Sequence, residues 1–181
     1  LKHTPGNTVS NLSSSRALKD VTEAYGQQYH AAAVGEVNVV AEMKRTHSVI
    51  GGEGNGGVIY PESHYGRDAL VGVGLFLSHY VAQSKKMTEL KSTYPPYFIS
   101  KNKMTLSPDM DVDKILEGLK ERYATEKVTD IDGVKIDFAQ GWVHLRKSNT
   151  EPIIRIYSEA KDEAAANQLA EEVIAAAKST L

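Results

Sequence analysis

Residues 1–93 alternate between short apolar runs and amphipathic stretches. Strands are expected where β-branched and small apolar residues stand between glycine, proline or polar clusters, at residues 8–12, 29–34, 48–50 and 58–60. Helices are expected where apolar residues recur at helical spacing, at residues 16–25, 36–45 and 65–83. This order of strands and helices favours a mixed, mostly parallel α/β/α domain.

The pattern changes after residue 93. Tyr94-Pro95-Pro96-Tyr97 is stiff and extended, so residues 94–103 are predicted to be a linker. The elements expected beyond it are helices at 111–123 and 161–178, a hairpin at 130–138 that turns at Asp132-Gly133, and strands at 142–145 and 153–157. Residues 104–181 therefore predict a small α+β domain with an antiparallel sheet and two helices.

Composition narrows the classes of protein. Hydrophobic residues make up 41% of 181, which suits a packed core, and a net charge of -2 gives no basic field for nucleic acid. The chain has no cysteine, hence no disulfide framework and no thiolate zinc site. The longest apolar run, 69–77, is too short to span a bilayer, and no secretory signal is visible. We therefore expect a cytoplasmic protein without membrane or nucleic-acid partners.

The polar run 146–152 carries the densest candidate chemistry. Arg146, Lys147, Ser148, Asn149 and Thr150 precede a proline, and Arg155 follows. A guanidinium can donate hydrogen bonds to two phosphate oxygens at once, and hydroxyl and amide groups can donate to the remaining lone pairs. The residues thus predict a phosphate-binding loop, while an ordinary polar turn stays the alternative.

A glycine-rich run at 51–57 is the second candidate. It contains G-x-G-x-x-G, but a dinucleotide site needs this motif to open a helix, and here the strand-like 58–60 follows. A tight hairpin turn explains the glycines better. Glu53 is then a carboxylate that a ligand can approach closely, because its neighbours lack side chains.

Both runs resemble the α-D-phosphohexomutases, a family of phosphoglucomutases, phosphomannomutases and phosphoglucosamine mutases. R-x-S-N-T-E-P followed by R-x-x-x-E is similar to the phosphate-binding loop of the family's last domain. The matching residues are Arg146, Ser148, Asn149, Thr150, Glu151, Pro152, Arg155 and Glu159. Residues 52–56 resemble the sugar-binding loop G-E-x-S-G-H of its third domain, with Asn55 in place of serine and Gly57 in place of histidine.

The resemblance implies an isomerase that interconverts hexose 1-phosphate and 6-phosphate through a phosphoserine and a hexose 1,6-bisphosphate. Substrate phosphate would be bound by Arg146, Ser148, Asn149, Thr150 and Arg155, and the sugar by Glu53 and Asn55. The family's serine loop and its aspartate-rich Mg²⁺ loop belong to its first two domains, and neither motif occurs in this sequence. Together with the start at Leu1 rather than Met, this predicts a C-terminal fragment that is inactive alone and needs the preceding domains of its own chain.

Two other functions remain open on the sequence alone. A non-catalytic sugar-phosphate-binding module would explain why the serine and Mg²⁺ loops are missing, and a dinucleotide-dependent oxidoreductase rests only on the glycine pattern. The departures at Asn55 and Gly57 favour phosphoglucosamine mutase, with phosphoglucomutase/phosphomannomutase as runner-up.

Several other residues have simpler explanations. No two of the six histidines stand at metal-ligand spacing. His144 shares a strand face with Arg146, but a hydrogen-bonded strand histidine is the better interpretation, and Trp142 is expected in the core. Ser63-His64 is interpreted as a helix N-cap.

Overall fold

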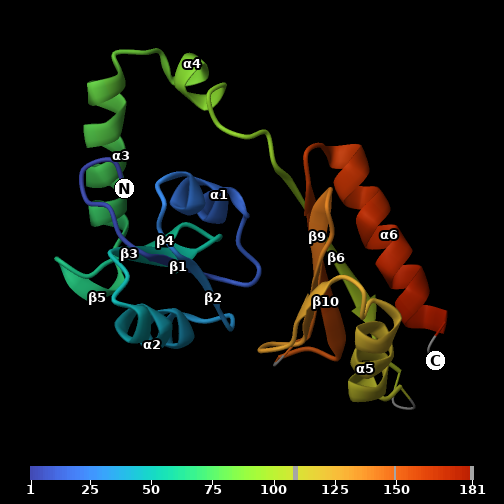
Figure 1. The fold of residues 1–181 in the computed structure, drawn as a ribbon. Helices are drawn as coiled ribbons and strands as arrows, with labels where there is room; N and C mark the ends of the chain where they lie inside the picture. The colour runs from blue at the N-terminus through green and yellow to red at the C-terminus, as the bar shows by residue number, and fades with distance from the viewer. Residues whose placement is uncertain (108–109, 149, 180–181) are drawn as a thin grey trace. The chain divides into compact units, whose positions relative to one another are not determined.

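The computed structural model describes residues 1–107, 110–148 and 150–179 (Figure 1). The chain forms two compact units, Leu1–Pro95 and Pro96–Leu181, each built around its own five-stranded sheet. The expected fold class, an α/β unit followed by an α+β unit, is confirmed.

The first unit contains a mixed sheet in the order β2-β1-β3-β4-β5. Its elements are β1 (Thr8–Asn11), α1 (Ala17–Ala24), β2 (Tyr29–Ala32), α2 (Glu36–Thr46), β3 (Ile50–Glu53), β4 (Gly57–Tyr60), β5 (His64–Arg67), α3 (Ala69–Gln83) and α4 (Met87–Lys91). Strand β1 pairs in parallel with β2 and β3, as the alternation of strands and helices predicts. Strands β4 and β5 extend the sheet in antiparallel fashion, because short turns connect them.

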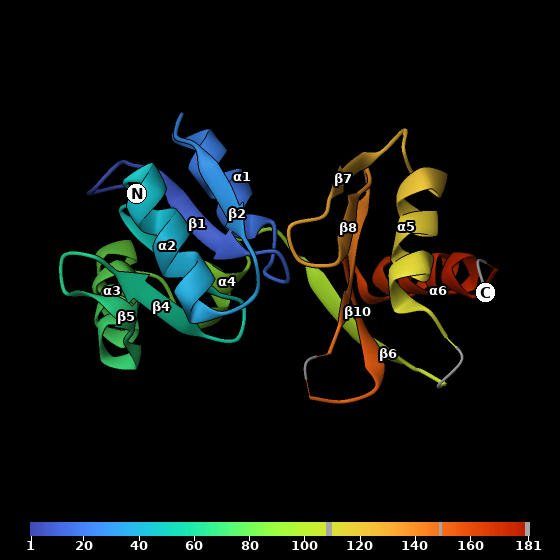
Figure 2. The same ribbon diagram turned by 90° about the horizontal axis from the view of Figure 1, so that it is seen from below.

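Helices cover both faces of this sheet. Successive strand residues point to opposite faces, so Thr8 and Val9 on β1 identify the two sides. The hydroxyl of Thr8 lies 2.7 Å from that of Thr22 on α1. Val9 belongs instead to a buried cluster with Met43 of α2, and Figure 2 shows α2 across the sheet from below.

The helix expected at 65–83 begins later than predicted. Residues 64–67 form β5, and α3 starts at Ala69 because the carboxylate of Asp68 accepts hydrogen bonds from the backbone N–H groups of Leu70 and Val71. The N-cap expected at Ser63-His64 is therefore wrong. Asp68 is the N-cap of α3. Nε2 of His64 lies 3.1 Å from Oδ2 of the Asp68 carboxylate.

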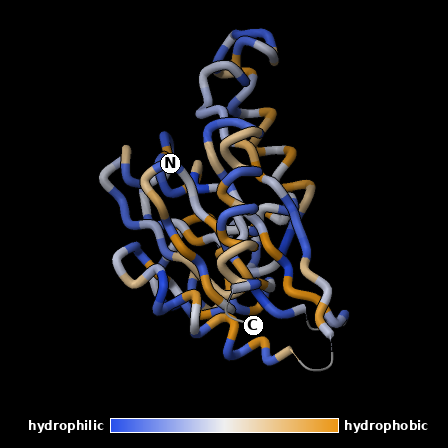
Figure 3. The backbone as a smooth tube through the Cα atoms, turned by 90° about the vertical axis from the view of Figure 1, so that its right-hand side faces the viewer, coloured by the Kyte–Doolittle hydropathy of each residue, from blue (hydrophilic) through white to orange (hydrophobic). Residues whose placement is uncertain are grey.

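The second unit contains an antiparallel sheet in the order β6-β10-β9-β8-β7. Its elements are β6 (Phe98–Thr105), α5 (Val112–Arg122), β7 (Lys127–Thr129), β8 (Val134–Asp137), β9 (Gly141–Lys147), β10 (Ile153–Ala160) and α6 (Glu163–Ser179). Figure 2 shows α5 and α6 on the same side of this sheet. Figure 3, coloured by hydropathy, shows apolar and hydrophilic stretches alternating along the chain.

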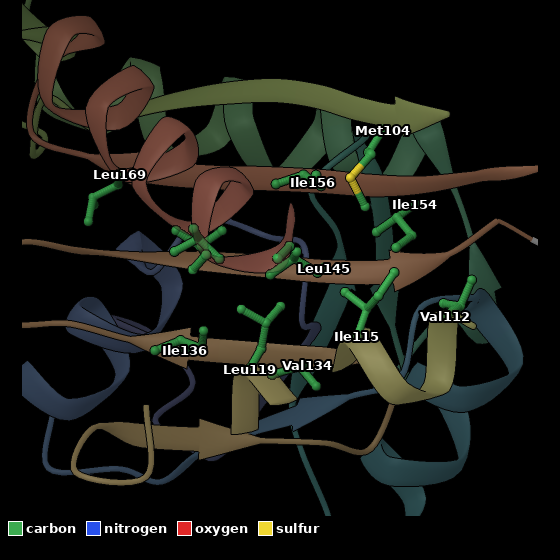
Figure 4. Close-up of a cluster of buried hydrophobic side chains, with 14 of the residues drawn as sticks. Met104, Val112, Ile115, Leu119, Val134, Ile136, Leu145, Ile154, Ile156 and Leu169 are labelled. Atoms are coloured by element: carbon green, nitrogen blue, oxygen red, sulfur yellow. The ribbon is translucent and has the colours of Figure 1, made fainter. Parts of the chain in front are cut away.

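One apolar core joins these helices to one face of the sheet (Figure 4). Leu145, Ile154 and Ile156 of the central strands are fully buried there against Ile115 and Leu119 of α5. Burying each such side chain contributes about 1.5–3 kcal/mol. Odd and even residues of a strand face opposite sides, so Arg146 and Arg155 lie on the face away from the helices.

Residues 98–103, assigned to the linker, form most of β6. The strand pairs with β10 along its whole length, from Phe98 opposite Ala160 to Thr105 opposite Ile153. Its sequence, Phe-Ile-Ser-Lys-Asn-Lys-Met-Thr, has no regular alternation of apolar and polar residues, so only its pairing with a distant strand identifies it. The hairpin expected at 130–138 is formed by β7 and β8 and begins earlier, at Lys127; Gly133 takes the positive φ of 69° that its turn requires.

Candidate functional site

The glycine-rich run forms a hairpin rather than a helix-opening loop. Strands β3 and β4 are antiparallel, with Glu53 opposite Gly57, so the turn itself is only 54–56. A dinucleotide site of the kind the G-x-G-x-x-G motif describes is therefore contradicted. Gly52 is needed because a Cβ there would overlap the Gly57 carbonyl of the facing strand.

Glu53, at the end of β3, is held by donors from distant parts of the chain. Its Oε1 accepts hydrogen bonds from Asn11 Nδ2 at 2.9 Å and from the Gly35 backbone N–H at 3.1 Å. Its Oε2 lies 3.4 Å from Nη1 of Arg67, and the Glu53 side chain is only 5% exposed. This carboxylate is thus fixed in one orientation by three donors.

The loop after β1 supports the glycine turn as well. Ser14 Oγ donates to Asn11 Oδ1 at 2.8 Å and accepts a hydrogen bond from the Gly54 backbone N–H, also at 2.8 Å. Ser15, the next residue, accepts a hydrogen bond from the Ala17 N–H at 3.2 Å, just before α1. Asn11 and Ser14 were missed as supports, because nothing local relates them to Glu53.

A hollow of about 480 Å³ opens beside the glycine turn. Its lining residues are Glu36, Asn55, Gly56, Gly57, Arg67, Asp68 and Ala69. Asn55 is exposed, and its Oδ1 accepts a hydrogen bond from the Gly57 backbone N–H at 3.2 Å. The candidate residue Glu53 therefore precedes the turn, and Asn55 lies within the turn, at the hollow.

Arg67 and Glu36 are functional candidates that sequence reasoning missed. Arg67 donates to Glu36 twice, from its backbone N–H at 3.0 Å and from Nε at 2.8 Å. These hydrogen bonds, the backbone one first, hold the pKa of Glu36 below its ordinary value. Asp68 could have identified Arg67 from the sequence. If Asp68 is taken as the N-cap of α3, Arg67 falls at the end of the preceding strand, close in sequence to the glycine hairpin.

The phosphate-loop residues connect β9 and β10 in the second unit. Ser148 is buried, and its backbone N–H donates to the Ile153 carbonyl at 3.0 Å. Its hydroxyl lies 3.5 Å from both the Oγ1 and the backbone N–H of Thr150. Asn149 lies outside the described residues. Ser148 and Thr150 are thus close to each other at this turn.

Three cationic residues form one row across three strands at the base of this turn. Arg155 of β10 stands opposite Arg146 of β9 on one side and opposite Lys103 of β6 on the other. Glu151 offsets part of this charge through a 2.8 Å ion pair with Arg155 Nη2. Arg146 Nε is buried and has no hydrogen-bond partner among the described residues, so a donor remains unused in this row.

The residues behind the row are structural. His144 is buried with Nε2 2.7 Å from the Asp132 carbonyl, which confirms the hydrogen-bonded strand histidine. Burial, assisted by the charges of Lys135 and Arg146, lowers its pKa from 6.5 to about 4. Trp142 is fully buried as expected, and its Nε1 donates to Glu159 Oε1 at 2.8 Å.

Two features are absent from the described part of the chain. No group of three or more His, Asp or Glu side chains within it is placed to hold a metal ion. None of its helices has both the length and the apolar character that crossing a membrane requires.

Each unit matches a separate family model. Residues 1–97 match the model described as phosphoglucomutase/phosphomannomutase, alpha/beta/alpha domain III, and residues 101–176 match that of the phosphoglucomutase/phosphomannomutase C-terminal domain.

Relatives of known name agree with these matches. A phosphoglucosamine/phosphogalactosamine mutase of Sulfurisphaera tokodaii is 36% identical over 91% of this chain and 37% of its own length. A phosphoglucomutase/phosphomannomutase of Thermococcus kodakarensis is also 36% identical, over 92% of this chain and 36% of its own length. The chain thus spans little more than a third of the relatives it matches.

Solved structures share the fold. A phosphoglucomutase/phosphomannomutase family protein of Burkholderia thailandensis superposes with a TM-score of 0.80 at 22% identity, over 99% of this chain and 39% of that one. A phosphomannomutase, described as putative, from Thermus thermophilus gives 0.71 at 26% identity, over 94% of this chain and 36% of that one.

Proposed function

Because the chain belongs to the phosphoglucomutase/phosphomannomutase family, we propose that it is the substrate-binding C-terminal part of a phosphohexomutase. In the complete enzyme it would bind a hexose phosphate while the preceding domains transfer the phosphoryl group. Relatives named phosphoglucosamine mutase and phosphoglucomutase/phosphomannomutase define the class of reaction, an isomerisation of hexose phosphates.

The cation row carries this proposal. Like charges directly opposite each other destabilise a sheet, so Lys103, Arg155 and Arg146 side by side cost stability unless an anion binds beside them. A sugar phosphate supplies that anion. Arg146 and Arg155 provide the positive charge, and the hydroxyls of Ser148 and Thr150 lie at the adjoining turn. Asn149, the third small donor that we propose, lies outside the described residues.

The sugar would bind at the glycine hairpin of the first unit. Glu53 Oε1 already has two donors, whereas Oε2 has one long contact to Arg67. A carboxylate oxygen accepts about two hydrogen bonds, so Oε2 retains capacity for a sugar hydroxyl. Asn55 lines the adjacent hollow and supplies an amide side chain.

The remaining parts of the reaction belong to the missing domains. The family's phosphoserine and Mg²⁺ loops have no counterpart in this sequence, and the described residues offer no metal cluster. The residues present therefore do not fit the Mg²⁺ ion, and no step of the reaction is assigned to it. A neighbouring structure of Aspergillus fumigatus N-acetylphosphoglucosamine mutase contains glucose 1,6-bisphosphate, which supports a bisphosphate intermediate. We place the complete enzyme in the cytoplasm and expect this chain alone to be inactive.

Replacing Arg146 tests the phosphate site. In the complete enzyme, Arg146→Ala should weaken sugar-phosphate binding by roughly 1.5–3 kcal/mol, the range for a hydrogen bond to a charged group. Affinity is measured by titration calorimetry with hexose 6-phosphate. Arg122→Ala, which removes an equal charge from the exposed end of α5, is the matched control and should bind normally. Unchanged affinity in Arg146→Ala would contradict the proposal.

A further inference from the structure

Gly57 and Arg67 share one space beside the hollow. A Cβ placed on Gly57 would lie 2.6 Å from Arg67 Cδ and 3.1 Å from its Cγ. The glycine thus leaves room for the arginine stem to cross the hairpin. A side chain at position 57 would displace the Arg67 side chain. The position of Arg67 therefore depends on glycine at position 57.

Crossing the hairpin brings the guanidinium between two carboxylates. Arg67 Nε lies 2.8 Å from Glu36 Oε2, and its Nη1 lies 3.4 Å from Glu53 Oε2. Glu53 is nearly buried, whereas the Glu36 side chain is 33% exposed and lines the hollow. Each Glu36 oxygen accepts one hydrogen bond from Arg67 and so keeps a free lone pair.

Charge on the wall of the hollow is unbalanced. Its charged lining residues are Glu36, Asp68 and Arg67, two carboxylates to one guanidinium. Asp68 is occupied by the two backbone N–H groups at the start of α3 and by His64. Glu36 is therefore the carboxylate that can receive a ligand. It remains ionised because its hydrogen bonds from Arg67 lower its pKa.

We propose that Glu36, positioned by Arg67 across Gly57, determines substrate preference by binding the ammonium group of an aminohexose phosphate. An ammonium group donates three hydrogen bonds and accepts none, which matches a carboxylate with unused lone pairs. A neutral hydroxyl at the same place also donates a hydrogen bond to the carboxylate, but it lacks the positive charge that attracts the ammonium group to Glu36 in addition. This inference rests on the proposed function and adds the substrate class.

The experiment compares two substrates in the complete enzyme. Glucosamine 6-phosphate and glucose 6-phosphate differ at one position, an ammonium group in place of a hydroxyl. Glu36→Gln removes the charge but keeps an oxygen that Arg67 can bind. We expect kcat/KM for glucosamine 6-phosphate to fall about tenfold, while that for glucose 6-phosphate changes by less than about threefold.

Glu42→Gln is the matched control. It removes the same charge from the same helix, where Glu42 pairs with Arg45 at 2.6 Å and does not line the hollow. The ratio of the two kcat/KM values should stay unchanged in this variant. An equal effect of Glu36→Gln on both substrates, in a protein with unaltered thermal unfolding, would overturn the inference.

A measurement on the unaltered enzyme covers the case in which Glu36→Gln does not fold. As pH rises from about 7 to about 9, amines of this kind lose their proton, so the preference for glucosamine 6-phosphate should decline. A ratio that stays constant across this range would also contradict a role for Glu36. If the unaltered enzyme converts neither sugar phosphate, the proposed function fails. If it converts both and the ratio never responds, only this inference fails.

Discussion

The two candidate loops are stabilised in opposite ways. At the glycine hairpin, the Glu53 carboxylate is surrounded by donors from Asn11, Gly35 and Arg67. At the β9–β10 turn, Arg146 faces Arg155, so a cation stands opposite a cation. The first loop therefore contributes to the stability of the fold, whereas the second reduces it and retains unused capacity to bind an anion.

This difference indicates which part of a sugar phosphate each loop is suited to recognise. A sugar presents many hydroxyls that differ only in direction, so the group that reads them must be held rigidly. A phosphate presents charge, and cations that are only partly paired attract it strongly. Under the proposed function, the first loop would therefore supply selectivity and the second would supply affinity.

The largest expected effect comes from removing the sugar-loop carboxylate. Glu53→Ala leaves the donors of Asn11 and Gly35 without an acceptor, and unsatisfied buried donors cost about 1–3 kcal/mol each. We expect the first unit to lose roughly 3–5 kcal/mol of stability, measured by urea unfolding followed by circular dichroism. Glu62→Ala, which removes an exposed carboxylate between β4 and β5, should leave the transition unchanged. An unaltered transition in Glu53→Ala would show that this carboxylate is not a support.

Acidification should weaken the second unit through His144. Its pKa of about 4 in the fold lies below its ordinary 6.5, so the folded state favours the neutral ring. The free energy of unfolding is therefore unaffected by this histidine above about pH 6.5. As pH falls from 6.5 towards 4, the unfolded state binds a proton that the folded state does not, and stability decreases by up to about 3 kcal/mol. Fluorescence of Trp142, the single tryptophan of the chain, reports this unfolding.

His144→Gln should flatten this pH dependence between about pH 6.5 and 4. His3→Gln, at an exposed position, should leave it intact. An equal pH dependence in His144→Gln and the unaltered chain would show that burial of this ring does not govern acid stability.

The smallest expected effect tests the cation row. Lys103→Thr removes the like charge opposite Arg155 and should stabilise the second unit by a few tenths of a kcal/mol, the scale of cross-strand charge pairs. Phosphate affinity should decrease in the same variant. Lys101→Thr, two residues earlier and opposite Tyr157, is the control. Loss of stability in Lys103→Thr would show that repulsion within the row does not destabilise the second unit. The contrast drawn between the two loops would then be wrong.

Sequence patterns predicted the elements wherever local and global preferences agree. Helix α5 and its apolar positions Ile115 and Leu119 follow the expected spacing, and both are buried. The pattern failed at β6 and β5, because each is an edge strand with polar, exposed positions. Such strands are defined by the partner with which they pair, which local sequence does not contain.

The chain of residues by itself determined the two kinds of domain, the family and the two loops that carry candidate chemistry, because turns, caps and motifs depend on neighbours in sequence. Only the tertiary structure decided which groups support or complete those loops. Arg67 reaches Glu36 across 31 positions of sequence, and Glu53 is fixed by Asn11 from 42 positions away. Hydrogen bonds and charges act over a few ångströms of space, so a carboxylate's partners are set by how the sheet brings distant segments together.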